Sequence, residues 1–260
     1  MSKPKGKQRK NFCQGLLALL AALLAVLLVA GFIGSGETSV RADWRTASRE
    51  PLGIAPNPVA TREAIAQVYT ARAFSWRGIF GVHSWIAVKP TDALSFTVYE
   101  VIGWNAYHGG DALSIQEKEP DRRWFGAKPR VIADIRGKGV DDVIKRIDDA
   151  ARRYPYKGDY VVWPGPNSNT FTAFVARAVP ELRLDLPPTA IGKDYLPGGD
   201  LIASAPSGTG FQVSLFGLLG VLAGKEEGLE VNLLGLTFGI DPMDLALKLP
   251  MAGRIGLQEN

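Results

Sequence analysis

One serine stands where its hydroxyl could act as a nucleophile. Ser168 lies in the stretch WPGPNSNTF, directly before an amphipathic helical pattern. A nucleophile at a helix N-terminus meets a positive potential, and free N–H groups near Asn169 could hold an oxyanion. Alternatively, Asn167, Ser168, Asn169 or Thr170 caps the helix, because their side-chain oxygens accept backbone N–H bonds. The local sequence leaves both interpretations open.

A serine nucleophile depends on a general base, and the chain has only two histidines. His83 sits among apolar residues in GVHSWI, which is typical of a strand. Glu100, in VYEVIGW, would lie on the neighbouring strand, where a carboxylate could orient the imidazole and stabilise its charged form. His108, in the predicted loop NAYHGGD, is an alternative base or third member. Each of the three also has a structural interpretation, as a satisfied strand residue, a solvent-facing acid or a loop residue.

Further residues are candidates for ligand binding. Lys193, Asp194 and Tyr195 follow a glycine in TAIGKDY, where they could line a cleft over the Ser168 helix or form a surface turn. The tryptophans favour core or cleft walls over a sugar-binding platform. The candidate binding residues are Asn167, Asn169, Trp85, Trp163, Lys193, Asp194 and Tyr195.

Composition excludes several classes of site. Cys13 is the only cysteine, so the chain can form no internal disulfide and no site with several cysteine ligands. Two histidines make a zinc site improbable, and we predict no metal and no cofactor. The net charge of +4 is concentrated in the first ten residues, so we expect no nucleic-acid partner.

The N-terminus carries a pattern that predicts a membrane protein. Basic residues dominate the head at 1–11, and residues 12–33 are almost wholly apolar, close to the roughly 20 residues that cross a bilayer as a helix. We therefore predict a single-pass protein of the bacterial inner membrane, in contact with lipid and with most of the chain in the periplasm. A cleaved signal peptide is the alternative to an uncleaved anchor.

The rest of the chain predicts an α+β fold. After a linker at 34–60, strands are expected at 63–73, 78–88, 95–103, 130–135 and 158–163. Helices are expected at 140–153 and from Ser168 to just before Pro180. The expected domain at 61–200 is thus an antiparallel sheet packed with two helices. In the tail at 201–260, two apolar runs at 210–224 and 228–240 flank KEE and predict a β-hairpin that forms extra sheet or lies in a membrane interface.

The order of these elements resembles the circularly permuted papain-like fold of the NlpC-type hydrolases and the lecithin:retinol acyltransferase-like proteins. In those families a histidine strand precedes a stretch such as Asn-Cys-x-x-Phe at a helix start. His83 matches the histidine, and residues 167–171 match the second stretch with Ser168 in place of cysteine. The resemblance covers roughly residues 63–182. It implies either a serine variant of the enzyme or a binding protein that has kept the cleft and lost the chemistry.

A closer resemblance covers most of the chain after the apolar run. The strings HSWIAVKP, YEVIGW, PDRRWFG, WPGPNSNTF and LPPTAIGKDY are similar to those of an uncharacterised, mainly proteobacterial family of membrane-associated proteins. That family implies no known activity.

Two functions follow from these patterns. The first is a hydrolase or acyltransferase acting on an amide or ester of an envelope component, with Ser168 as nucleophile, His83 as base and Glu100 or His108 as orienting group. The second is a non-catalytic envelope protein that binds a peptide, glycan or lipid in the same cleft, or acts as a scaffold.

Overall fold

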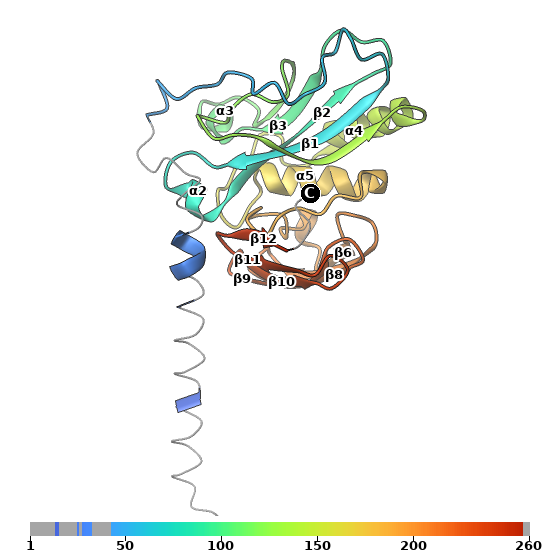
Figure 1. Ribbon diagram of the computed structural model, residues 1–260. Coiled ribbons are helices and arrows are strands. Elements are labelled where there is room, and N and C mark those ends of the chain that lie inside the picture. The colour runs from blue at the N-terminus through green and yellow to red at the C-terminus, as the bar shows by residue number, and fades with distance from the viewer. Residues whose placement is uncertain (1–13, 16–24, 26–27, 33–42, 257–260) are drawn as a thin grey trace, which may run out of the picture.

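The computed structural model describes residues 14–15, 25, 28–32 and 43–256. Two antiparallel sheets enclose a helical layer in which α5 lies between them (Figure 1). The first sheet has the strand order β4-β3-β2-β1-β5. Its strands are β1 (Ile65–Arg72), β2 (Val82–Lys89), β3 (Thr97–Val101), β4 (Leu113–Glu117) and β5 (Arg130–Arg136).

Side chains of the first sheet alternate between two buried faces, as the period of a β-strand requires. On β2, Ile86 and Val88 pack in the cluster that contains both long helices. Trp85 and Ala87 point the other way, into a separate cluster that Trp124 covers. Because both faces are buried, a shift of one residue along a strand moves its side chain to a chemically different environment.

Two long helices cover one face of this sheet. Helix α4 (Val140–Arg153) buries one apolar stripe and begins with two acidic residues, which suit the helix dipole. Helix α5 (Ser168–Ala178) is buried over most of its circumference, including polar residues of its first turns, and packs on β2 and β3. The short elements are α2 (Arg77–Phe80), α3 (Gly103–Tyr107), η1 (Pro180–Leu182) and η2 (Pro197–Gly199).

The second sheet is a meander in which each strand pairs with its neighbour in sequence. Tight turns join the strands, and residues with positive φ occupy many of these turns. Its strands are β6 (Ile202–Ser204), β7 (Gly210–Leu215), β8 (Leu219–Gly224), β9 (Gly228–Leu233), β10 (Leu236–Asp241), β11 (Ala246–Leu249) and β12 (Gly253–Ile255).

The predicted fold class is wrong in two respects. The α+β composition is found, but there are two antiparallel sheets, not one. The tail does not form a single hairpin, because each apolar run at 210–224 and 228–240 turns back at its own glycine, Gly217 or Gly235, and supplies two strands. In addition, β4 was not expected, and residues 158–163 form no strand because their backbone leads into a proline-rich loop.

The predicted transmembrane anchor at residues 12–33 also has to be corrected. In the part of the chain that the structure describes, no helix combines the length and the apolar character needed to cross a membrane. The single-pass inner-membrane location inferred from that anchor is therefore not supported. Most of residues 12–33 lies outside the described residues.

The packing of α5 gives a first testable prediction. Phe171 is fully buried, and its ring lies edge-on to Tyr154, with the centroids 5.2 Å apart. We expect Phe171→Ala to lower the free energy of unfolding by about 3–5 kcal/mol, because it removes buried apolar surface and leaves a cavity. Urea unfolding followed by circular dichroism measures this. Leu94→Ala, at a side chain that is 70% exposed, is the control and should change the value by less than about 0.5 kcal/mol.

Candidate functional site

The N-terminus of α5 is capped by Asn167, the residue before Ser168. The Asn167 side chain accepts hydrogen bonds from the backbone N–H groups of Asn169 and Thr170. The Thr170 hydroxyl in turn accepts from the Asn167 backbone N–H, which completes a capping box. The N–H groups expected to hold an oxyanion near Asn169 are therefore engaged by the cap.

Side chains at this helix start also tie α5 to the first sheet. The Asn169 amide donates to the backbone oxygens of Val82, at 3.0 Å, and Ile191, at 2.8 Å. The Ser84 hydroxyl lies 2.9 Å from both Asn169 Oδ1 and Thr172 Oγ1. Asn167 and Asn169, predicted as ligand-binding residues, thus have structural partners within the fold.

His83 and Ser168 are not brought together. Ser84, the neighbour of His83 on β2, faces α5, so His83 faces the opposite side of the sheet. The ring of His83 stacks on Trp124, with a centroid separation of 3.6 Å, and lies beside Trp85. Among the described residues, none forms a hydrogen bond with the Ser168 hydroxyl, and Ser168 itself is buried.

The predicted neighbour of His83 does lie beside it. The register pairs Trp85 with Glu100, so Glu100 projects on the same face as His83. Glu100 Oε2 is 3.4 Å from His83 Nε2, and its other oxygen contacts the Lys118 ammonium. Burial raises the pKa of Glu100, but the bonds from His83 and Lys118 outweigh it, so the net shift is downward. Burial lowers the pKa of His83, against the opposing effect of Glu100.

Three other predicted residues, His108, Trp85 and Trp163, lie in different parts of the fold. His108 is exposed at the end of α3, with Nδ1 2.8 Å from the Trp104 backbone oxygen. Trp85 is buried, stacks parallel to Tyr69, and donates to the Pro120 oxygen. Trp163 is half exposed and donates through Nε1 to the backbone oxygen of Leu234.

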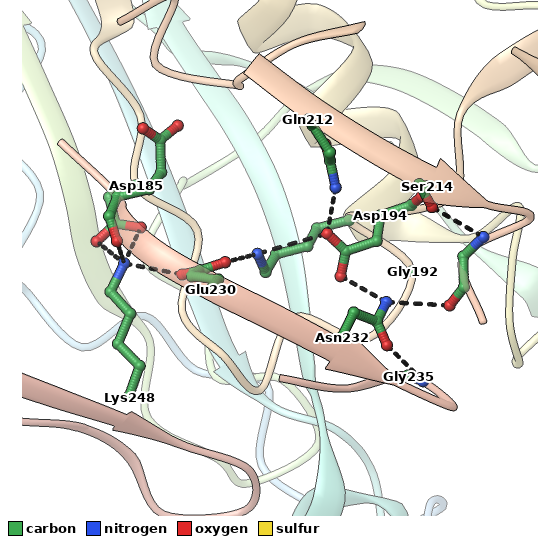
Figure 2. A network of polar contacts seen from close by, with 12 residues as sticks. Asp185, Gly192, Asp194, Gln212, Ser214, Glu230, Asn232, Gly235 and Lys248 are labelled. Carbon is green, nitrogen blue, oxygen red and sulfur yellow. Dashed lines mark hydrogen bonds and ion pairs between the residues drawn. The ribbon is translucent and has the colours of Figure 1, made fainter. Parts of the chain in front are cut away.

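Lys193 and Asp194 belong to a buried ionic network beneath the second sheet, not to an open cleft (Figure 2). The Lys193 ammonium contacts Glu230 and lies 3.7 Å from Asp194 Oδ1. Asp194 accepts from the side-chain amides of Gln212 and Asn232 on the inner face of that sheet. The pair therefore fastens the loop before η2 to β7 and β9.

A second lysine extends this network. Lys248 Nζ lies 2.7 Å from both oxygens of Asp185 and 2.9 Å from Glu230 Oε1. Burial raises the pKa of Asp185 to about 6. Burial also opposes ionisation of Glu230, but Lys193 and Lys248 reverse that effect and lower its pKa. Lys248 and Glu230 were not predicted as a pair, because they come from β9 and β11, and the contact depends on how these strands assemble.

Tyr195 lies in an open pocket of about 430 Å³ at the other side of this loop. Tyr107, Tyr156 and Tyr160 share the wall with it, together with Asp159 and Pro166 near the start of α5. The rings form edge-on pairs, Tyr107 with Tyr160 at 6.4 Å and Tyr156 with Tyr195 at 6.0 Å. Tyr107, Tyr156 and Tyr160 were not predicted as binding residues. The signal that could have revealed two of them is YPYKGDY, residues 154–160, which is unusually rich in tyrosine.

The pocket wall depends on a glycine. A Cβ added to Gly103, at the start of α3, would lie 2.4 Å from the Tyr160 ring, so only glycine permits this contact. Burial raises the pKa of the Tyr160 phenol, and burial together with Tyr156 raises that of Tyr195. These phenols therefore stay protonated and can donate hydrogen bonds to a ligand.

The geometry at His83 predicts a pH dependence of stability. The folded-state pKa of His83 lies below the unfolded value of about 6.5. As the pH falls through the unfolded-state pKa, the imidazole of the unfolded chain binds a proton while that of the folded chain stays neutral, so the free energy of unfolding falls. We expect His83→Gln to show a shallower decline than the wild type between about pH 7.5 and pH 5.5. Urea titrations at each pH measure this, and equal slopes would contradict it.

The ionic network gives a separate prediction. Lys193→Met leaves Glu230 and Asp194 with less charge compensation in a buried site, and we expect it to lower the free energy of unfolding by about 3–5 kcal/mol. Arg183→Met, which breaks the more exposed pair with Glu226, is the control and should cost less than about 1 kcal/mol. Equal small losses in both variants would show that the network does not hold the second sheet.

Comparison with protein families assigns this chain to one of them. Residues 63–195 match a family model described as "Protein of unknown function (DUF3750)", which is just over half of the 260 residues. The match contains the first sheet, both long helices and the tyrosine pocket, and it ends at Tyr195, before the second sheet. No curated protein and no solved structure matches the chain. The chain belongs to this family of proteins of unknown function.

Proposed function

We propose that this protein is a non-catalytic binding module whose ligand occupies the tyrosine pocket. The observation that carries this proposal is the convergence of Tyr107, Tyr156, Tyr160 and Tyr195 on one open hollow of about 430 Å³. That volume is within the range of small-ligand sites, which combine apolar rings with a few polar groups. The wall comes from three segments of the chain, at residues 106–107, at 156–166 and at Tyr195, so the pocket is a product of the fold.

The chemistry of the wall favours a ligand with both an apolar face and hydroxyl groups. Tyrosine rings offer flat apolar surface, and their hydroxyls donate or accept hydrogen bonds. Asp159 adds a carboxylate that accepts hydrogen bonds from a ligand. A short glycan presents such faces and hydroxyls, and we propose it as the ligand class; an extended peptide would use the rings without needing Asp159.

Geometry at Ser168 supports binding over hydrolysis. A serine nucleophile has to be within hydrogen-bond reach of its base. His83 lies on the far face of the sheet, the helix N–H groups are occupied by Asn167, and Ser168 is buried. These positions support a binding role over hydrolysis at Ser168.

We also propose that the distant relationship to permuted papain-like proteins is one of architecture. The order of elements supports it: a histidine-bearing strand, β2, precedes α5, whose N-terminus opens with Asn-Ser and packs against that strand. A mainly proteobacterial distribution of the family, expected from the motif strings, likewise remains a proposal.

Saturation-transfer NMR with chitobiose and with maltose tests the binding proposal. We expect transfer to the sugar protons with at least one disaccharide, and a Kd roughly fivefold higher in Tyr107→Ala, since one stacked ring contributes about 1 kcal/mol. Trp76→Ala is the control, because Trp76 is an exposed aromatic residue outside the pocket. Absence of transfer with both sugars, or equal loss in the two variants, would refute a glycan site.

A fluorophosphonate probe tests the hydrolase alternative. We expect the wild type and Ser168→Ala to give the same labelling, because His83 faces away from α5 and none of the described residues forms a hydrogen bond with the Ser168 hydroxyl. Labelling that the wild type shows and the variant loses would reinstate the hydrolase.

A further inference from the structure

The outer face of the second sheet is apolar from β7 to β11. Alternation places one set of side chains toward α5 and the other toward the outside. From β7 to β11 every outward position is aliphatic or phenylalanine. The outward residues are Phe211, Val213, Leu215, Leu219, Val221, Ala223, Leu229, Val231, Leu233, Leu236, Phe238, Ile240, Leu247 and Leu249.

The strand register aligns these residues into continuous rows. One row runs through Val213, Val221, Val231 and Phe238, each paired with the next across the sheet. The four six-residue strands β7–β10, at about 4.8 Å spacing and about 20 Å long, alone give a face of roughly 400 Å². That is within the range of the largest apolar patches on monomeric soluble proteins, which often have a function, so we expect this face to have a partner.

The inner face of the same sheet is polar, which is the reverse of the usual pattern. Gln212, Ser214, Glu230, Asn232 and Lys248 all point inward and are buried. The ionic network on Lys193 and Lys248 fixes which face is turned out. The exposure of the apolar rows is therefore specified by the register and is not a result of loose packing.

The turns at one end of the sheet continue the apolar surface. Phe216 and Leu234 occupy the turns between β7 and β8 and between β9 and β10, with φ of 52° and 54°, and both side chains are more than half exposed. Bulky residues rarely adopt positive φ, where glycine or asparagine would cost less. Trp163, half exposed, places its indole N–H on the Leu234 oxygen, at the border between apolar and polar surface.

We propose that this outer face lies on a lipid surface, with the side chains of β7–β11 among the acyl chains. A protein partner would be recognised through aromatic and arginine anchors and matching hydrogen bonds, whereas these outward positions carry aliphatic side chains and two phenylalanines. Lipid needs only apolar area, and a tryptophan at the border is typical of a membrane interface.

The N-terminal sequence supports lipid as the occupant. Two described residues of the apolar run lie beside this sheet: Ala30 is buried, and a Cβ on Gly31 would lie 3.6 Å from Met251 Sδ in the turn before β12. The ten residues before the run carry Lys3, Lys5, Lys7, Arg9 and Lys10, which attract anionic lipid headgroups. Stable attachment to a lipid surface usually needs two such signals acting together.

The test has to report on the sheet face itself, because the basic residues at the N-terminus could attract the full chain to vesicles without it. Full-length protein carrying Cys13→Ser receives one new cysteine for a bimane label, at Val221 or at Leu229 on the outer face. Leu94→Cys, at an exposed apolar residue of the β2–β3 connection, is the matched control. Emission is compared on phosphatidylcholine vesicles with brominated and unbrominated acyl chains, and circular dichroism confirms that each protein is folded.

We expect brominated lipid to quench the label at positions 221 and 229 and to leave position 94 unchanged. No quenching at 221 and 229, or equal quenching at 94, would overturn the proposal. Protection of the label at 221 from aqueous iodide before lipid is added, with no later quenching by brominated lipid, would also overturn it and indicate a second copy of the chain as the occupant.

Discussion

Two buried lysines and the carboxylates around them hold the second sheet against the rest of the fold. Lys193 comes from the loop after α5, while Glu230 and Lys248 come from β9 and β11. Arg177, at the end of α5, adds bonds to the backbone of Lys193 and Ser204. Removing either lysine would leave buried carboxylates with less charge compensation, which costs several kcal/mol. The polar face of the second sheet is therefore buried in the interior, and its apolar face is exposed.

Strand alternation has an equally strong effect on the first sheet. His83 and Ser84 are adjacent in sequence but face opposite clusters, one of stacked aromatic rings and the other the polar start of α5. A base for Ser168 would have to face α5, as the Ser84 hydroxyl does, whereas His83 faces the other cluster. The family match covers both environments and ends where the second sheet begins, so the pocket and the apolar face belong to different parts of the chain.

Much of the secondary structure could be predicted because its signals are local. The spacing of Val140, Val143, Ile144 and Ile147 identified α4, and these residues are buried as expected. The pairing of His83 with Glu100 followed from two adjacent strands joined by a short connection. Lys118 could not be foreseen, since its approach to Glu100 depends on β4, which the sequence did not reveal. The transmembrane prediction depended on hydropathy alone. It was wrong because no helix among the described residues has the length and apolar character needed to cross a membrane.

By itself, the sequence determined the α+β composition, the two long helices, the polar cap before α5 and the apolar alternation of the tail, because each depends on residues within one or two turns or strands. Only the tertiary structure decided which face each strand turns inward. Contacts distant in sequence made that choice: Lys193 with Glu230, Asp185 with Lys248, and Tyr160 against Gly103. The alternation in the sequence divides the side chains of each strand into two sets, and a shift of one residue exchanges the faces of these sets. The pattern alone does not say which set is turned inward, so it could not specify the site.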